Sequence, residues 1–209
     1  MEVLITSVSA GGLGEIIVSF EIRNGDNKSI SRLLISDAAY IALSISAGIS
    51  DISTYDAVER ESNIYVAYKK ALYLLGYASS SRRALLRKLV AKGCEAEYAN
   101  LALDRLEENG FFCESEFAIR EGEKCLAKLW GAERIRAHLR EKGYSDNSIS
   151  SVFFAFEDMG VDFDENCVRL IEKKYSHIPT DKKALQGIIA SLMRYGYSLS
   201  QIKCALSKK

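Results

Sequence analysis

Basic side chains at helical spacing are the groups in this chain with the clearest potential for binding chemistry. They form a cluster in each of three successive helical segments, and arginine dominates the first two clusters. Arginine binds carboxylate or phosphate through two parallel hydrogen bonds. A single cluster is most often a solvated face, but recurrence makes a binding surface an equally good interpretation. The candidate binding residues are Arg82, Arg83, Arg87, Lys88, Arg134, Arg136, Arg140, Lys142, Lys182, Lys183 and Arg194, with Lys173, Lys174 and Lys203 in the third cluster.

Residues that could support catalysis or metal binding form no recognisable pattern. Neither His138 nor His177 has a second histidine or a cysteine at a metal-ligand spacing. The glycine-rich segment 10–14 is followed by no Lys-Ser or Lys-Thr pair, so a turn is favoured over a phosphate-binding loop. Acidic residues at helix starts, such as Glu165, are explained by the helix dipole. We therefore expect no enzyme activity, no metal and no cofactor.

Charge is balanced over the whole chain but uneven along it. The 28 basic and 28 acidic residues cancel, whereas residues 1–66 carry a net charge of −5 and residues 167–209 one of +7. A general polyanion binder would be basic throughout, so the pattern favours a partner of mixed charge. The five scattered cysteines are expected to be reduced thiols. With no apolar run long enough for a bilayer and no basic stretch at the N-terminus, a cytoplasmic location is expected.

The elements that must position the basic clusters fall into two kinds. The first 35 residues are typical of β structure, with turns at 10–14 and 24–27, and a short helix is expected over about 38–46, followed by a linker around Gly48. From about Thr54 the pattern is helical to the end. Gly131 is expected to end the helix before it, and Pro179, the only proline, to end the helix predicted over 164–175. We predict a β meander with a short helix over 1–52 and three-helix repeats over 53–112, 113–161 and 162–209.

The repeats share one apolar pattern around a glycine. Apolar residues lie seven and three positions before the residue that precedes Gly93, Gly143 or Gly196. The pairs are Leu85 and Leu89, Ile135 and Leu139, and Ile188 and Leu192. Such self-similarity predicts a mainly α fold of three tandem three-helix repeats in an elongated, curved array, preceded by a small antiparallel β segment.

The middle repeat differs from its neighbours at two positions. It has Arg136 and Arg140 where the first repeat has Leu86 and Val90 and the third has Ile189 and Met193. We predict that the outer repeats bury these apolar residues, whereas the two arginines line an exposed surface.

Two segments carry a family resemblance that spans roughly residues 62–209. One is Leu-x-x-Lys-Leu-x-x-Lys-Gly at 85–93, followed by Arg105 to Phe111 and Glu114 to Ala118, and the other runs from Gly131 to Tyr144. They resemble the RecX family of bacterial RecA regulators. The chain departs from the usual pattern in having Glu114 in place of Asp, and Leu129-Trp130-Gly131 in place of a Gly-Tyr-Gly style lead-in.

The resemblance implies a non-enzymatic modulator that binds in the groove of the RecA–DNA filament and inhibits its ATPase and strand exchange. It implies the RecA filament as partner, with single- or double-stranded DNA as a further candidate. We also expect the protein to be a monomer. Two alternatives stay open from the residues themselves. The chain could be a nucleic-acid-binding helical protein that acts without RecA, or a structural adaptor for another protein.

Overall fold

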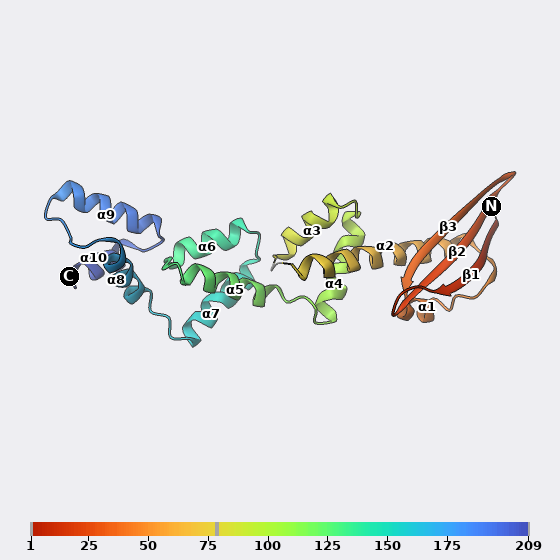
Figure 1. Cartoon of the computed structure of the whole chain (residues 1–209), viewed down its shortest axis with the longest axis horizontal. Helices are drawn as coiled ribbons and strands as arrows, with labels where there is room; N and C mark the ends of the chain where they lie inside the picture. The colour runs from red at the N-terminus through yellow and green to blue at the C-terminus, as the bar shows by residue number, and fades with distance from the viewer. Residues whose placement is uncertain (1, 78–79, 209) are drawn as a thin grey trace. The chain divides into compact units, whose positions relative to one another are not determined.

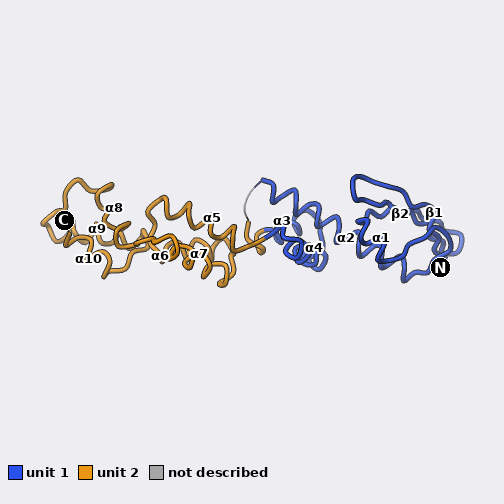
Figure 2. Tube along the Cα trace, turned by 90° about the horizontal axis from the view of Figure 1, so that it is seen from below, with its two compact units in different colours: residues 1–78, 85–112 blue, residues 79–84, 113–209 orange. Residues whose placement is uncertain are grey.

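The computed structural model describes residues 2–77 and 80–208. The chain divides into two compact units, residues 1–78 with 85–112 and residues 79–84 with 113–209 (Figure 2). Each unit is described by itself below, and Figure 1 labels the helices and strands β1 to β3. The finer division into four parts stays a prediction, because these two units group the elements more coarsely. None of the helices within the described residues is long and apolar enough to cross a membrane.

The first unit begins with an antiparallel sheet. Its strands are β1 (Glu2–Ala10), β2 (Glu15–Asn24), β3 (Asn27–Ser36) and β4 (Gly48–Ser50), in the order β3-β2-β1-β4. The two predicted turns are present, and their glycines Gly14 and Gly25 have φ values of 71° and 61°. The prediction of a linker around Gly48 is wrong, because residues 48–50 pair with β1 and add a fourth strand.

One face of this sheet forms a core with helix α2. The largest fully buried side chains there, Phe20 and Ile35, alternate along their strands with outward-facing residues, as a half-buried sheet requires. Val58 of α2 (Ile52–Leu75) joins the same core. The preceding helix α1 spans only Asp37–Ala42, shorter than predicted. It is capped at its start by the Ser36 hydroxyl, which accepts a hydrogen bond from the amide of Ala39.

Helix α2 also belongs to the first three-helix repeat, with α3 (Arg82–Ala91) and α4 (Ala96–Glu108). Its C-terminal half packs on α4 through Ile64 and Ala67. The Arg105 guanidinium of α4 donates two hydrogen bonds to the carboxylate of Glu61 at 2.7 and 2.8 Å. The 24 residues of α2 therefore connect the core of the sheet to that of the repeat within the first compact unit.

The second unit holds the other two repeats. The second repeat contains α5 (Glu114–Leu126), α6 (Ala132–Glu141) and α7 (Asp146–Asp158), and the third contains α8 (Phe163–Lys174), α9 (Lys182–Arg194) and α10 (Leu199–Ser207). The predicted apolar pattern is confirmed, because both apolar residues that precede the shared glycine are buried in each repeat. The glycines that follow, Gly93, Gly143 and Gly196, have φ values of 82°, 84° and 91°, which suits a residue without a Cβ atom.

Three sequence-based predictions about the repeats are wrong. Val90 and Met193 of the outer repeats are 46% and 49% exposed, so the outer repeats do not bury these positions. Pro179 does not end the helix before it, since α8 ends at Lys174. Gly131 does not end α5 either. That helix ends at Leu126, and Gly131 caps the start of α6.

Gly131 is instead the contact point of the second and third repeats. Its amide donates a hydrogen bond to the carbonyl of Tyr195 at 2.7 Å, and the amide of Glu133 donates one to the carbonyl of Gly196. A Cβ atom on Gly131 would lie 2.3 Å from the carbonyl oxygen of Gly196. The Tyr197 hydroxyl also donates to the carbonyl of Leu129 at 2.9 Å. The first residues of α6 are thereby fixed against the turn between α9 and α10.

Candidate interaction surface

The basic residues of α6 lie on two opposite flanks of the helix, on either side of the buried residues Ile135 and Leu139. Residues four apart on a helix share a face. Arg134, His138 and Lys142 therefore form one row, which we call the α5 flank because it contacts α5. Arg136 and Arg140 form the other row, the α7 flank. Sequence reasoning grouped all four basic residues into one cluster, and the structure separates them.

The α7 flank is held in place by contacts with α7. The Arg136 guanidinium lies 3.6 Å from the centre of the Phe153 ring, and the Nε of Arg140 lies 3.4 Å from a carboxylate oxygen of Asp146. A cation over an aromatic ring stabilises by roughly 0.5–1 kcal/mol at an exposed site. The ring also restricts the side chain of Arg136, so less conformational entropy is lost when the guanidinium meets a partner.

At the N-terminal end of the α5 flank, Arg134 lies between two aromatic rings. Its guanidinium carbon is 4.0 Å from the centre of the Trp130 ring and 5.0 Å from that of Tyr195. The Lys174 ammonium lies 4.1 Å from the centre of the Tyr195 ring. Arg134 also donates a long hydrogen bond of 3.4 Å to the carbonyl of Arg194. The structure therefore brings predicted residues of the second and third clusters together around Tyr195.

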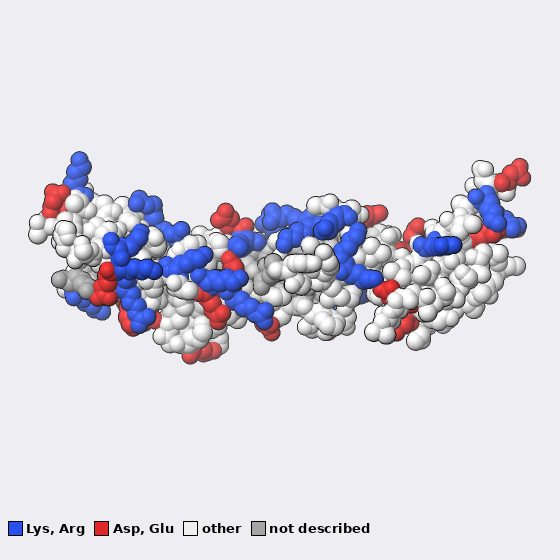
Figure 3. Space-filling view, viewed as in Figure 1, with Lys and Arg blue, Asp and Glu red and all other residues white. Residues whose placement is uncertain are grey.

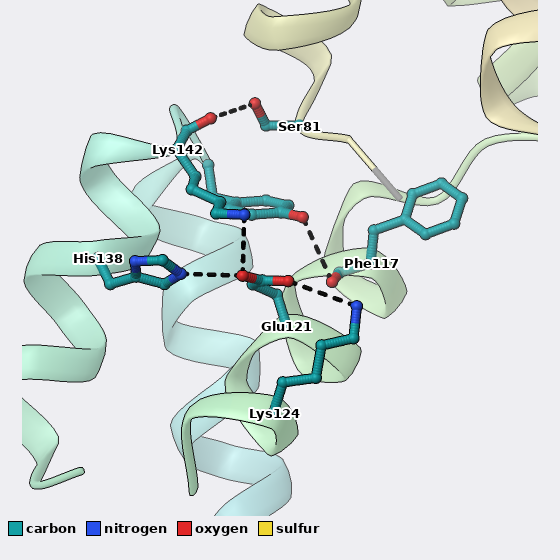
Figure 4. Close-up of polar contacts among 7 residues, drawn as sticks. Ser81, Phe117, Glu121, Lys124, His138 and Lys142 are labelled. Carbon is teal, nitrogen blue, oxygen red and sulfur yellow. Dashed lines mark hydrogen bonds and ion pairs between the residues drawn. The ribbon is translucent and has the colours of Figure 1, made fainter. Parts of the chain in front are cut away.

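The C-terminal end of the α5 flank is organised around Glu121 of α5 (Figure 4). His138 donates from Nε2 to the Glu121 carboxylate at 2.9 Å, and the Lys142 ammonium lies 3.0 Å from the same oxygen. Lys124 approaches the other oxygen at 3.6 Å. Burial raises the pKa of Glu121, but the hydrogen bonds from His138 and Lys142 outweigh it and lower that pKa to about 2. Lys142 is thus used within the repeat, although it was predicted as a binding residue.

The turn that begins α3 packs against the same repeat. The Ser81 hydroxyl donates to the carbonyl of Lys142 at 2.7 Å, and a Cβ atom on Gly143 would lie 3.3 Å from the side chain of Arg83. Arg83 is therefore close to the C-terminal end of α6, and Arg194 is close to its N-terminal end. Helix α6 joins parts of all three predicted clusters within the second unit.

Glu114, at the start of α5, forms hydrogen bonds with the starts of two other helices. Its carboxylate accepts hydrogen bonds from the amide of Arg82 at 2.8 Å, from the Ser145 hydroxyl at 2.6 Å and from the Ser148 hydroxyl at 2.9 Å, and a longer one from the Ser145 amide. Burial raises the pKa of Glu114, yet the bonds from Ser145, Arg82 and Ser148 leave it lowered. The acidic side chain at this position therefore joins the starts of α3, α5 and α7.

The exposed ridge of α6 between the two flanks is not basic. It consists of Glu133, Ala137 and Glu141, which are spaced four apart and exposed. The equivalent ridge of α3 is Arg83, Arg87 and Ala91, so the first repeat presents two arginines where the second presents two glutamates. Figure 3 shows basic side chains gathered over α3, and it shows acidic and basic side chains together over α5 and α6. Helix α6 is therefore suited to a surface of mixed charge.

The remaining predicted residues lie elsewhere. Lys182 and Lys183 are exposed at the start of α9, about 18 Å along that helix from Arg194 at its end. Arg87 and Lys88 are exposed on the part of α3 that belongs to the first unit. Sequence reasoning did not predict the stacking roles of Trp130, Tyr195 and Phe153. Nothing local in the sequence shows which guanidinium will lie on which ring.

The chain is similar to known proteins over most of its length. Residues 67–106 match the model of the first three-helix domain of RecX. A regulatory protein RecX from Xanthomonas axonopodis pv. citri (strain 306) is 33% identical over 138 residues, which cover 66% of this chain and 83% of that protein.

Two solved structures share the fold. The crystal structure of a regulatory protein RecX matches 96% of this chain and 98% of its own, with a TM-score of 0.71 and 18% identity. The crystal structure of RecX from Lactobacillus salivarius matches 70% of this chain and 96% of its own, with a TM-score of 0.60 and 23% identity. At these identities the likeness concerns the fold alone.

Proposed function

The chain belongs to the RecX family, and from this premise we propose that it regulates RecA by binding the RecA–DNA filament and inhibiting its ATPase and strand exchange. The observation that carries the proposal is the surface of α6. Two arginine flanks border a ridge with Glu133 and Glu141, and the guanidinium of Arg136 is held in place by Phe153. A filament of protein and nucleic acid offers carboxylates, phosphates and basic groups side by side. Such a partner matches this surface better than a uniform polyanion does.

The α7 flank is the part of this surface that is best suited to an external partner. Among the described residues, Arg136 contacts the Phe153 ring and no acidic group, and the ion pair between Arg140 and Asp146 is exposed. Exposed ion pairs contribute only about 0–1 kcal/mol, so a partner carboxylate or phosphate can replace Asp146 at little cost. By contrast, Lys142 and His138 of the α5 flank already contact Glu121, whose side chain is largely buried.

The test is the rate of RecA ATP hydrolysis on single-stranded DNA, titrated with this protein at fixed salt. We expect wild-type protein to lower the rate and the Arg136→Glu/Arg140→Glu variant to require at least tenfold more protein for the same effect. The matched control is Arg120→Glu/Arg169→Glu, which makes the same change of charge at two exposed arginines on α5 and α8. Equal inhibition by wild type and the α6 variant would refute the role given to the α7 flank.

A second candidate function, nucleic-acid binding without RecA, rests on α3. Its ridge presents Arg83 and Arg87 with no acidic residue between them, unlike the ridge of α6. If this function dominates, binding to bare single-stranded DNA is tight, weakens steeply as salt rises, and is lost in Arg83→Glu/Arg87→Glu. The rate of ATP hydrolysis by RecA would then fall only in proportion to the amount of DNA bound by this protein. Adding more DNA would restore the rate.

A further inference from the structure

Three side chains with different metal-binding groups meet between α5 and α6. A carboxylate oxygen of Glu121, the sulfur of Cys125 and a ring nitrogen of His138 all lie within 4.8 Å of one another. Glu121 and Cys125 share a face of α5 because they are four residues apart, and packing of α6 against α5 brings His138 to them. The sequence gives no sign of this set, because Cys125 and His138 are thirteen positions apart.

We propose that Glu121, Cys125 and His138 bind a zinc-like divalent cation. Thiolate, imidazole and carboxylate are the three ligand types that Zn²⁺ takes from proteins, at about 2.0–2.3 Å from the metal. Tetrahedral coordination at those bond lengths places neighbouring ligand atoms about 3.3–3.7 Å apart. The three ligand atoms must therefore move closer together by about 1 Å when the metal binds. Rotation of the flexible Glu121 side chain provides this movement. A water molecule completes the fourth position.

The surroundings of the cluster suit a fixed ligand set. The side chains of Glu121 and His138 are only 13% and 23% exposed, and Cys125 is 1% exposed, so bulk water has limited access. The Trp130 ring lies edge-on to the His138 imidazole, with ring centres 5.2 Å apart. This contact restricts rotation of the imidazole, and fixing the orientation of a ligand strengthens metal binding.

The Lys142 ammonium must move away from Glu121 before a metal cation can bind there. The Lys142 ammonium lies 3.0 Å from the Glu121 oxygen that His138 also contacts, and its side chain is 48% exposed. It can therefore turn into solvent when a metal takes its place. Binding forms a metal–sulfur bond and a metal–nitrogen bond. The Cys125 thiol releases its proton to solvent, and the His138 imidazole binds through a ring nitrogen that carries no proton, with its one proton on the other ring nitrogen. A carboxylate and a thiolate together then balance the two charges of the cation. The bound cation would link α5 directly to α6, which carries both arginine flanks.

The test uses the purified full-length chain after removal of metals with a chelator. Titration with Zn²⁺ against a chromophoric chelator should show one tight site. Titration with Co²⁺ should give a near-ultraviolet thiolate-to-cobalt absorption band. The fluorescence of Trp130, the one tryptophan of the sequence, should change in step with both signals.

Matched variants separate this site from other thiols and imidazoles. Affinity should fall more than about tenfold in Cys125→Ala and in His138→Gln. It should be unchanged in Cys167→Ala, which removes a buried thiol of the third repeat, and in His177→Gln. His138 is partly exposed, so His138→Gln tests the site even if Cys125→Ala does not fold. Absence of a tight site in wild type, or equal affinity in wild type and His138→Gln, overturns the proposal. In the second case the exposed Cys113 and Cys204 are the source of binding.

Discussion

Gly131→Ala should disrupt the contact between the second and third repeats. Gly131 has φ of −77° and ψ of 165°, which alanine adopts without strain, so the effect of the substitution is purely steric. The added Cβ would meet the carbonyl oxygen and carbon of Gly196 at 2.3 and 2.4 Å, and the amide of Tyr197 at 2.8 Å. All three are backbone atoms, so no change of side-chain rotamer can relieve the overlap.

The loss of stability in Gly131→Ala can be worked out from the backbone contacts that must separate. Overpacking that shifts backbone destabilises by about 1–3 kcal/mol. Moving Gly131 away from Gly196 by about 1 Å also breaks its hydrogen bond to Tyr195 and the bond from Glu133, each with a net worth of about 0.5–1.5 kcal/mol. We therefore expect a loss of about 3 kcal/mol in the free energy of unfolding of the second unit.

Gly187→Ala is the matched control with the opposite sign. Gly187 lies inside α9, and a Cβ atom there would meet nothing within 4 Å. Alanine is favoured over glycine in a helix interior by about 0.5–1 kcal/mol, so this variant should be more stable than wild type. The same chemical change therefore destabilises at one position of the second unit and stabilises at another.

Urea unfolding followed by Trp130 fluorescence measures both variants, because this tryptophan precedes Gly131 and reports on the second unit alone. For a urea dependence of about 1–3 kcal/mol per molar, Gly131→Ala should lower the midpoint by 1 M or more, and Gly187→Ala should raise it slightly. A midpoint for Gly131→Ala within about 0.3 M of wild type would refute the reasoning from the Gly131–Gly196 contact.

Two further predictions concern single side chains of the second unit. Glu114→Gln should cost about 2 kcal/mol at neutral pH, because the carboxylate accepts four hydrogen bonds. Since the folded-state pKa of Glu114 is lowered, its stabilisation is present above about pH 4.5 and is lost as the pH falls through the folded pKa, so unfolding curves of wild type and variant should converge as the pH is lowered below 4.5. Convergence as the pH rises would contradict that sign. Arg134→Lys keeps the charge but loses the planar stack between Trp130 and Tyr195, so it should destabilise by about 0.5–1 kcal/mol and shift the Trp130 emission. An unchanged emission spectrum would show that the stack does not persist in solution.

The buried helical pattern was predictable because it depends on spacing within single helices. Leu85, Ile135 and Ile188 are buried at equivalent positions since each repeat must place one apolar stripe against its own neighbours. The glycines after them have positive φ values, as expected for residues just beyond a helix end. These features need only local sequence, and the prediction of a mainly helical chain with repeats is confirmed.

Features that depend on tertiary contacts were not predictable. Strand β4 has only three residues, too few for any periodicity, and it exists because β1 offers a free edge. Gly131 follows a helix and was therefore interpreted as its end, whereas its role is set by Gly196, 65 positions further on. Likewise, the separation of Arg134 from Arg136 onto opposite flanks requires knowing which stripe of α6 is buried and which helices cover its sides.

The three repeats have similar residues at equivalent buried positions and different residues at equivalent exposed positions. At the ridge of the second helix in each repeat stand Arg83 and Arg87, then Glu133 and Glu141, then Gln186 and Arg194. Packing constrains the buried stripe to similar residues, but it places no such limit on the ridge, so the ridge is free to match a partner. A partner that presents only phosphates, such as bare nucleic acid, would favour the same basic ridge in every repeat. Three different ridges instead favour a partner that offers different chemistry to each repeat, as a filament of protein and nucleic acid does.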